Sequence, residues 1–184
     1  TQKYYLARQN FISAVNTIKE HNDIIEKLNQ YNWVKTEMLN FRIGECYDRE
    51  NNFINAINYY REAFKLEKNH TDKLEILSMQ ALSEYFNNQI DSSRIHFAEI
   101  EKYYQNETID YSGSSPYTYI DFTLHKYYHA KGNPKKAQAY LTDAYNHIPK
   151  NDRTEYLKDD SRGKRLHKYY YIHEIIETYN QSIR

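Results

Sequence analysis

The chain has 184 residues, and its 25 basic and 25 acidic side chains give a formal net charge of zero at pH 7. This balance lacks the basic excess expected of a nucleic-acid-binding domain. A mean hydropathy of −0.99, with no apolar run near the roughly 18 residues of a membrane span, predicts no membrane partner. The single Cys46 cannot form an internal disulfide and nothing resembles a signal peptide, so we expect a cytoplasmic protein.

Few breakers interrupt the chain, which contains only four glycines and three prolines, so long helices with short connections are expected. The long connection from Asn106 to Pro116 is interpreted either as a surface insertion or as a flap over a ligand groove. The predicted fold class is all-α. In chain order, helices are predicted over residues 1–7, 11–30, 33–50, 53–67, 71–88, 91–106, 116–131, 134–148 and 164–182, with a short one near 152–160.

Residues 43–63 and 124–144 share one packing pattern at identical spacings. In each segment an aromatic residue closes one helix, and nine positions later a small-large-small ladder opens the next. A small residue at a helix crossing lets the two backbones approach closely. Gly44 suits that role, whereas His125 at the equivalent place predicts looser packing. The first segment has Tyr47 followed by Ala56, Tyr60 and Ala63, and the second has Tyr128 followed by Ala137, Leu141 and Ala144.

Two weaker copies extend the series. One reads Ser93, Phe97 and Ile100, with Glu84 or the adjacent Tyr85 as its closing residue. The other starts from Tyr5, predicts a helix that ends before Asn10, and continues with a ladder at positions 14, 18 and 21. This half unit predicts that the sequence is a fragment that lacks an N-terminal domain.

These spacings resemble the tetratricopeptide repeat (TPR), in which two antiparallel helices of about 34 residues form a unit that stacks on its neighbours. The resemblance implies a right-handed superhelical solenoid of antiparallel helix pairs, with about four to five units in a single domain over residues 1–184. It also implies recognition of a protein partner, and we expect no enzymatic activity.

The residues that could carry other chemistry have simpler interpretations. His125 and His129 are four residues apart on one helix face, but no third metal ligand is visible nearby. His173 begins a zinc-protease-like motif that lacks its second histidine. Runs such as Tyr169-Tyr170-Tyr171 divide between core and surface because neighbouring residues on a helix diverge by about 100°. We therefore expect no metal and no cofactor.

The resemblance also implies a binding surface. In the repeat family the first helices of successive units line a concave wall that contacts the ligand. Any one of these residues could instead be an ordinary half-buried helix residue. Carried onto this sequence, the peptide-binding positions are Met38, Phe41, Glu45 and Asp48 in one unit, Ser78, Leu82 and Tyr85 in the weaker middle unit, and Tyr119, Phe122, Lys126 and His129 in another.

Phrases such as Asn52-Phe53-Ile54-Asn55-Ala56, with the abundance of Asn and Tyr, are similar to the C-terminal domains of Gram-positive quorum-sensing receptors of the Rap, NprR and PlcR type. This resemblance implies a sensor that binds a short signalling peptide, forms a possible homodimer, and contacts DNA only through a missing N-terminal domain. The alternative is a protein-interaction scaffold or phosphatase-regulating adaptor without DNA binding.

Overall fold

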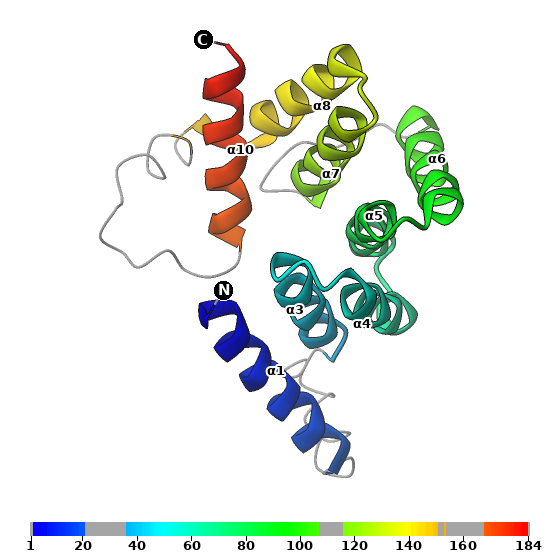
Figure 1. Ribbon diagram of the computed structural model, residues 1–184, viewed down its shortest axis with the longest axis vertical. Helices are drawn as coiled ribbons and strands as arrows, with labels where there is room; N and C mark the ends of the chain where they lie inside the picture. The colour runs from blue at the N-terminus through cyan, green and yellow to red at the C-terminus, as the bar shows by residue number, and fades with distance from the viewer. Residues whose placement is uncertain (1, 21–35, 107–115, 151–152, 154–167, 184) are drawn as a thin grey trace. The chain divides into compact units, whose positions relative to one another are not determined.

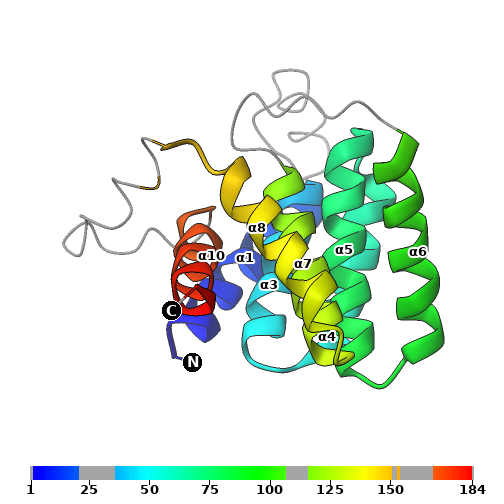
Figure 2. The same ribbon diagram turned by 90° about the horizontal axis from the view of Figure 1, so that it is seen from above.

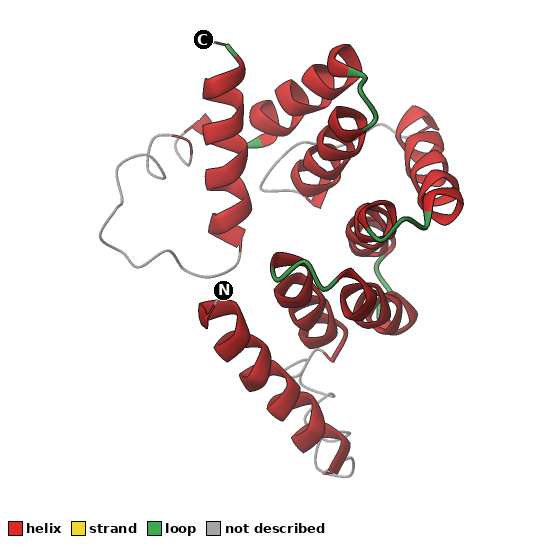
Figure 3. Cartoon of the chain, in the orientation of Figure 1, coloured by secondary structure: helices red, strands yellow, loops and turns green. Residues whose placement is uncertain are grey.

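The computed structural model describes residues 2–20, 36–106, 116–150, 153 and 168–183, and every long element among them is an α-helix (Figure 3). The all-α prediction is confirmed. No helix in this described part is long and apolar enough to cross a membrane. The helices are α1 (Gln2–Glu20), α3 (Thr36–Arg49), α4 (Phe53–Leu66), α5 (His70–Phe86), α6 (Ile90–Asn106), α7 (Pro116–Ala130), α8 (Pro134–His147) and α10 (Lys168–Ser182).

The chain forms two compact units, Thr1–Ala98 and Glu99–Arg184. In the first unit α3 packs along α4, and in the second unit α7 packs along α8 (Figures 1 and 2). Because each pair is joined by a short turn, its two helices are antiparallel. The described bounds agree with the sequence predictions to within three residues for these four helices. The superhelix and the single-domain organisation stay predictions.

The same turn joins the two helices of three successive pairs. In each, a residue with left-handed backbone follows the first helix, and the next amide donates to the carbonyl of the closing residue, which is the Schellman motif. Glycine and asparagine tolerate this backbone best. The left-handed residues are Asn51 (φ 57°), Asn88 (φ 63°) and Gly132 (φ 72°), and the hydrogen bonds are Asn52 to Tyr47 at 2.8 Å, Gln89 to Glu84 at 2.8 Å and Asn133 to Tyr128 at 2.9 Å.

This turn shows which residue closes the first helix of the middle copy, for which the sequence left Glu84 and Tyr85 as alternatives. Glu84 stands where Tyr47 and Tyr128 stand in the other pairs, and Tyr85 does not. All three ladders are buried, with exposed fractions of no more than 2%. The buried ladder residues are Ala56, Tyr60 and Ala63 in α4, Ser93, Phe97 and Ile100 in α6, and Ala137, Leu141 and Ala144 in α8.

The two matched helix pairs differ in which position of the crossing carries the larger side chain. In the first pair the residue on the first helix is small and the ladder residue is large, and in the second pair the sizes are reversed. A Cβ added at Gly44 would lie 2.6 Å from Cε1 of Tyr60, so glycine is required opposite that ring. In the second unit the larger His125 stands at the equivalent position, with the smaller Leu141 in place of Tyr60, and its Nδ1–H donates to the Ala137 carbonyl at 3.0 Å. The looser packing predicted for His125 is wrong, because it is only 9% exposed and hydrogen-bonded.

We predict that Gly44 and Tyr60 are energetically coupled. Gly44→Ala alone should lower the free energy of unfolding by about 1–3 kcal/mol, because the Tyr60 ring must move. In the double variant with Tyr60→Leu, the smaller side chain removes the clash. The double variant should therefore lose less free energy of unfolding than the sum of the losses in the two single variants. Urea unfolding of the three variants measures this coupling. Strict additivity would show that the crossing does not require glycine.

The N-terminal half unit predicted from the sequence is wrong. α1 runs without interruption from Gln2 to Glu20, through the predicted break at Asn10. The other turns place two or more turn-forming residues together, whereas Asn10 stands alone after helix formers such as Ala7 and Gln9. The predicted ladder position 21 lies outside the described residues, as does all of the short helix near 152–160 except Arg153.

Each closing residue, which is Tyr47, Glu84 or Tyr128, contacts a charged or polar side chain of the described helix that precedes its pair. Each contact joins the first helix of a pair to the described helix before it. The contacts are the Arg8 guanidinium 4.3 Å from the Tyr47 ring centroid, Arg61 Nη2 3.3 Å from Glu84 Oε1, and Tyr128 Oη 2.8 Å from Glu101 Oε2.

Glu84 is a fully buried carboxylate in the place of an aromatic ring. Gln80 Nε2 donates to its Oε1 at 2.8 Å, and His96 Nδ1 lies 2.8 Å from its Oε2. Burial alone would raise the pKa of Glu84, but the bonds to His96 and Gln80 and the charge of Arg61 outweigh burial and hold the pKa below its ordinary value. The carboxylate therefore stays charged inside the first unit.

Cys46 is also a packing residue. It is 5% exposed on α3, and burial, with the nearby Glu45 charge, raises its pKa to about 11. A thiol with such a pKa is almost entirely protonated near neutral pH, and the thiolate is the nucleophile. Cys46 is therefore a buried packing residue and not a reactive thiol.

Candidate functional site

In the first unit the first helices of two neighbouring pairs, α3 and α5, are joined by a hydrogen bond, and in the second unit α7 is joined to α10 by an ion pair. In the first unit, Ser83 Oγ of α5 donates to Asp48 Oδ1 of α3 at 2.8 Å. In the second unit, Lys126 Nζ of α7 lies 2.7 Å from Glu174 Oε1 of α10. We call these surfaces the α3–α5 wall and the α7–α10 wall. Adjacent first helices are the arrangement that the proposed binding surface needs.

The eleven predicted peptide-binding residues divide sharply by exposure. Five are exposed or half-buried, and six are buried. Met38 is 43% exposed, His129 is exposed, and Asp48, Tyr85 and Lys126 are half-buried, whereas Phe41, Glu45, Ser78, Leu82, Tyr119 and Phe122 are no more than 9% exposed. The apolar anchors expected from the sequence thus lie beneath the surface, and the accessible positions are mostly polar.

On α3 the predicted anchor Phe41 is a core residue. Its ring centroid lies 5.7 Å from that of Tyr60 in α4, so it fills the space between the two helices of the pair. One turn away, Arg42 Nη1 donates to Glu45 Oε2 at 2.6 Å. Glu45 is therefore held by its own helix, and Met38 is left as the accessible apolar side chain among the predicted positions of α3.

On α7 the predicted anchor Phe122 is covered by neighbouring side chains. The His125 ring stacks on it with centroids 5.7 Å apart, and Lys126 Nζ lies 4.6 Å from its centroid. Lys126 in turn pairs with Glu174. A ligand at this wall would meet the ammonium group and the exposed His129 before it met the phenyl ring.

The histidine pair on α7 is arranged for packing. The rings of His125 and His129 are 5.9 Å apart, and the His125 Nδ1–H is used by a backbone carbonyl. Burial lowers the pKa of His125, so it is neutral near pH 7. Among the described residues, no group of three His, Cys, Asp or Glu side chains is placed to hold a metal ion. His173 Nδ1 lies 3.3 Å from Glu177 Oε1 on α10.

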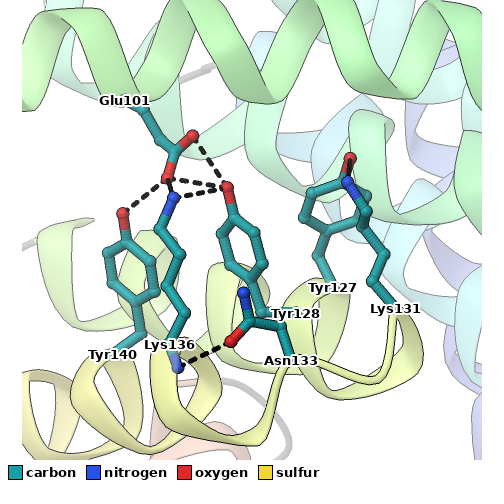
Figure 4. A network of polar contacts seen from close by, with 7 residues as sticks. All are labelled: Glu101, Tyr127, Tyr128, Lys131, Asn133, Lys136 and Tyr140. Carbon is teal, nitrogen blue, oxygen red and sulfur yellow. Dashed lines mark hydrogen bonds and ion pairs between the residues drawn. The ribbon is translucent and has the colours of Figure 1, made fainter.

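A polar network that the sequence did not reveal surrounds Glu101 of α6 (Figure 4). Its carboxylate accepts from Tyr128 Oη at 2.8 Å and Tyr140 Oη at 2.8 Å, and lies 2.6 Å from Lys136 Nζ. Burial raises the pKa of Glu101, but these bonds outweigh it and lower the pKa overall. Burial would lower the pKa of Lys136, but its bonds to Glu101 and Tyr128 outweigh burial and raise this pKa above its ordinary value. The periodicity of α6 gave no signal for this role.

Residues 39–70 match the sequence profile of the tetratricopeptide repeat family. The match covers α4 and all of α3 except its first three residues, so the α3–α4 pair is similar to one such repeat. No curated protein and no solved structure matches the chain. The repeat and the all-helical architecture support a TPR protein, and repeats of this kind form protein–protein interaction modules. The comparisons carry no information on quorum sensing, on transcription or on the eleven individual positions.

Proposed function

We propose that the chain is a peptide-binding sensor domain of a cytoplasmic regulator, which binds a short segment on the α3–α5 wall. The observation that carries the proposal is the Asp48–Ser83 hydrogen bond, which holds α3 and α5 next to each other. Met38 of α3 is exposed and Tyr85 of α5 is half-buried, and side chains of these types can bury apolar groups of a ligand.

The length of the wall suits a short ligand. Met38 and Asp48 are ten residues apart on α3, which spans about 15 Å at 1.5 Å per residue. An extended chain covers that distance with about four to five residues. The accessible side chains offer apolar contact near one end and polar contact near the other. The α7–α10 wall, with Lys126 and His129, is a second candidate surface for a segment that carries a negative charge.

The test is selection of peptides from a random heptapeptide library, followed by calorimetric titration of variants. Met38→Ala and Tyr85→Ala should each weaken binding by about tenfold or more, because burying such a side chain is worth roughly 1.5–3 kcal/mol. Lys65→Ala and Arg94→Ala are the controls, since both side chains are 67% exposed on α4 and α6. Equal affinity of all four variants would remove the α3–α5 wall as the site.

The sensor interpretation is separated from the alternative scaffold or phosphatase-regulating adaptor by a conformational measurement. A ligand shifts a conformational equilibrium only when it binds the two states with different affinity. A selected peptide that changes the radius of gyration in small-angle X-ray scattering supports a signal passed to a DNA-binding or effector region. Peptide binding with an unchanged scattering profile favours the scaffold.

A further inference from the structure

The turn between α7 and α8 concentrates positive charge in a chain whose net charge is zero. Between Lys126 and Asp143 the sequence contains no aspartate or glutamate. Three lysines lie at this turn and in the first turn of α8, and we call them the lysine surface: Lys131, Lys135 and Lys136. Lys131 and Lys135 are exposed, and Lys136 is half-buried.

Two of these lysines contact tyrosine rings (Figure 4). Lys131 Nζ donates to Tyr127 Oη at 3.3 Å and lies 4.9 Å from the ring centroid. Lys136 Nζ lies 4.1 Å from the centroid of Tyr128. Such cation–π contacts restrict the lysine side chains before any ligand arrives. Less conformational entropy is then lost when they bind an anion.

The carboxylate beside this surface is already engaged. Glu101 accepts from Tyr128 and Tyr140 and pairs with Lys136. Within the part of the chain that the structure describes, neither Lys131 nor Lys135 has a carboxylate partner. Lys131 and Lys135 therefore present positive charge that no acidic residue of the described ranges compensates.

We infer that the lysine surface docks an acidic segment of a partner protein. Opposite charge on a partner would steer it to this turn and fix its orientation. A protein segment fits better than nucleic acid because the whole chain has no basic excess and the surface has no arginine, the residue best suited to paired phosphate contacts. None of its three lysines is among the eleven predicted peptide-binding residues, so the inference does not rest on the proposed peptide site.

The probe is a fluorescein-labelled deca-glutamate peptide, with binding followed by fluorescence anisotropy at low and at moderate salt. The Lys131→Glu/Lys135→Glu variant should weaken binding by about tenfold or more, through repulsion added to lost attraction. The matched control is Lys65→Glu/Lys68→Glu, which changes the net charge equally at exposed lysines of the first unit. The control should change affinity by less than about twofold, because it leaves all three residues of the lysine surface in place.

Each outcome decides the inference. Selective weakening by the turn variant, with loss of binding at higher salt, supports it. Equal weakening by both variants would reduce the effect to net charge, and absence of binding by the unaltered protein would also overturn it. Tighter binding of an oligothymidylate of equal charge would assign the surface to nucleic acid instead. If thermal unfolding shows that the glutamate variant is misfolded, Lys131→Gln/Lys135→Gln must show a smaller loss in the same direction.

Discussion

Replacing Phe122 with alanine is expected to lower the free energy of unfolding by about 3–5 kcal/mol, the range for removal of a buried aromatic ring. The ring is 1% exposed, stacks on His125 and lies beneath the Lys126 ammonium. Its loss would leave a cavity in the second unit, between α7 and the side chains that cover it. Urea unfolding followed by circular dichroism measures the change without any ligand.

His129→Ala is the matched control on the same helix. His129 is exposed, so its replacement should change the free energy of unfolding by no more than about 0.5 kcal/mol. The sequence pattern predicted both residues as ligand contacts. Equal unfolding midpoints for Phe122→Ala and the unaltered protein would restore Phe122 as a surface anchor and contradict the packing described here.

The helix pairs could be predicted from the sequence because their determinants are local. The closing residue, the turn and the small-large-small ladder lie within about 20 consecutive residues, and the turn needs asparagine or glycine with a left-handed backbone. Asn51 and Gly132 supply it in the two matched pairs. The sequence pattern predicted two helices in place of α1, because the ladder spacing after Tyr5 matched the repeat although no turn sequence lies there. A matching spacing does not interrupt a helix unless turn-forming residues also end it.

The exposure of the wall could not be predicted because it depends on side chains from neighbouring helices. The position of Phe122 in its repeat places it on the face of the first helix, but the Lys126 side chain lies over its ring and pairs with Glu174 of α10. Lysine commonly covers apolar surface with its stem while its ammonium stays solvated. Helical periodicity assigns a residue to a face, and long flexible neighbours decide whether a ligand can reach it.

Glu84 shows the same limit inside the core. Its place in the repeat calls for an aromatic residue, and the sequence left Glu84 and Tyr85 as alternatives. A buried carboxylate is tolerated there because Gln80 and His96 approach it from α5 and α6, and Arg61 approaches from α4. A single repeat pattern does not include these partners, so this role emerged only from the three-dimensional arrangement.

Glu84→Ala is expected to lower the free energy of unfolding by about 2–4 kcal/mol. The change leaves the buried Gln80 amide and the His96 ring without their acceptor, and an unsatisfied buried polar group costs about 1–3 kcal/mol. A cavity adds to this loss. Glu84→Gln keeps the shape and part of the hydrogen bonding, so it should cost about 1–2 kcal/mol near neutral pH. Urea unfolding of both variants gives the comparison.

The effect of Glu84→Gln should also depend on pH. The folded protein holds the pKa of Glu84 below the ordinary value of 4.5. A carboxyl with a depressed folded-state pKa contributes stability above its unfolded-state pKa and loses it as the pH falls through the folded-state value. The difference in the free energy of unfolding between the unaltered protein and Glu84→Gln should therefore be largest near pH 7 and shrink below about pH 4.5.

The control is Glu62→Gln, at an exposed ion pair with Lys65. It should change the free energy of unfolding by less than about 0.5 kcal/mol at both pH values. A Glu84→Gln difference that stays constant across this pH range would mean that the carboxylate is not held in its charged form by Gln80, His96 and Arg61.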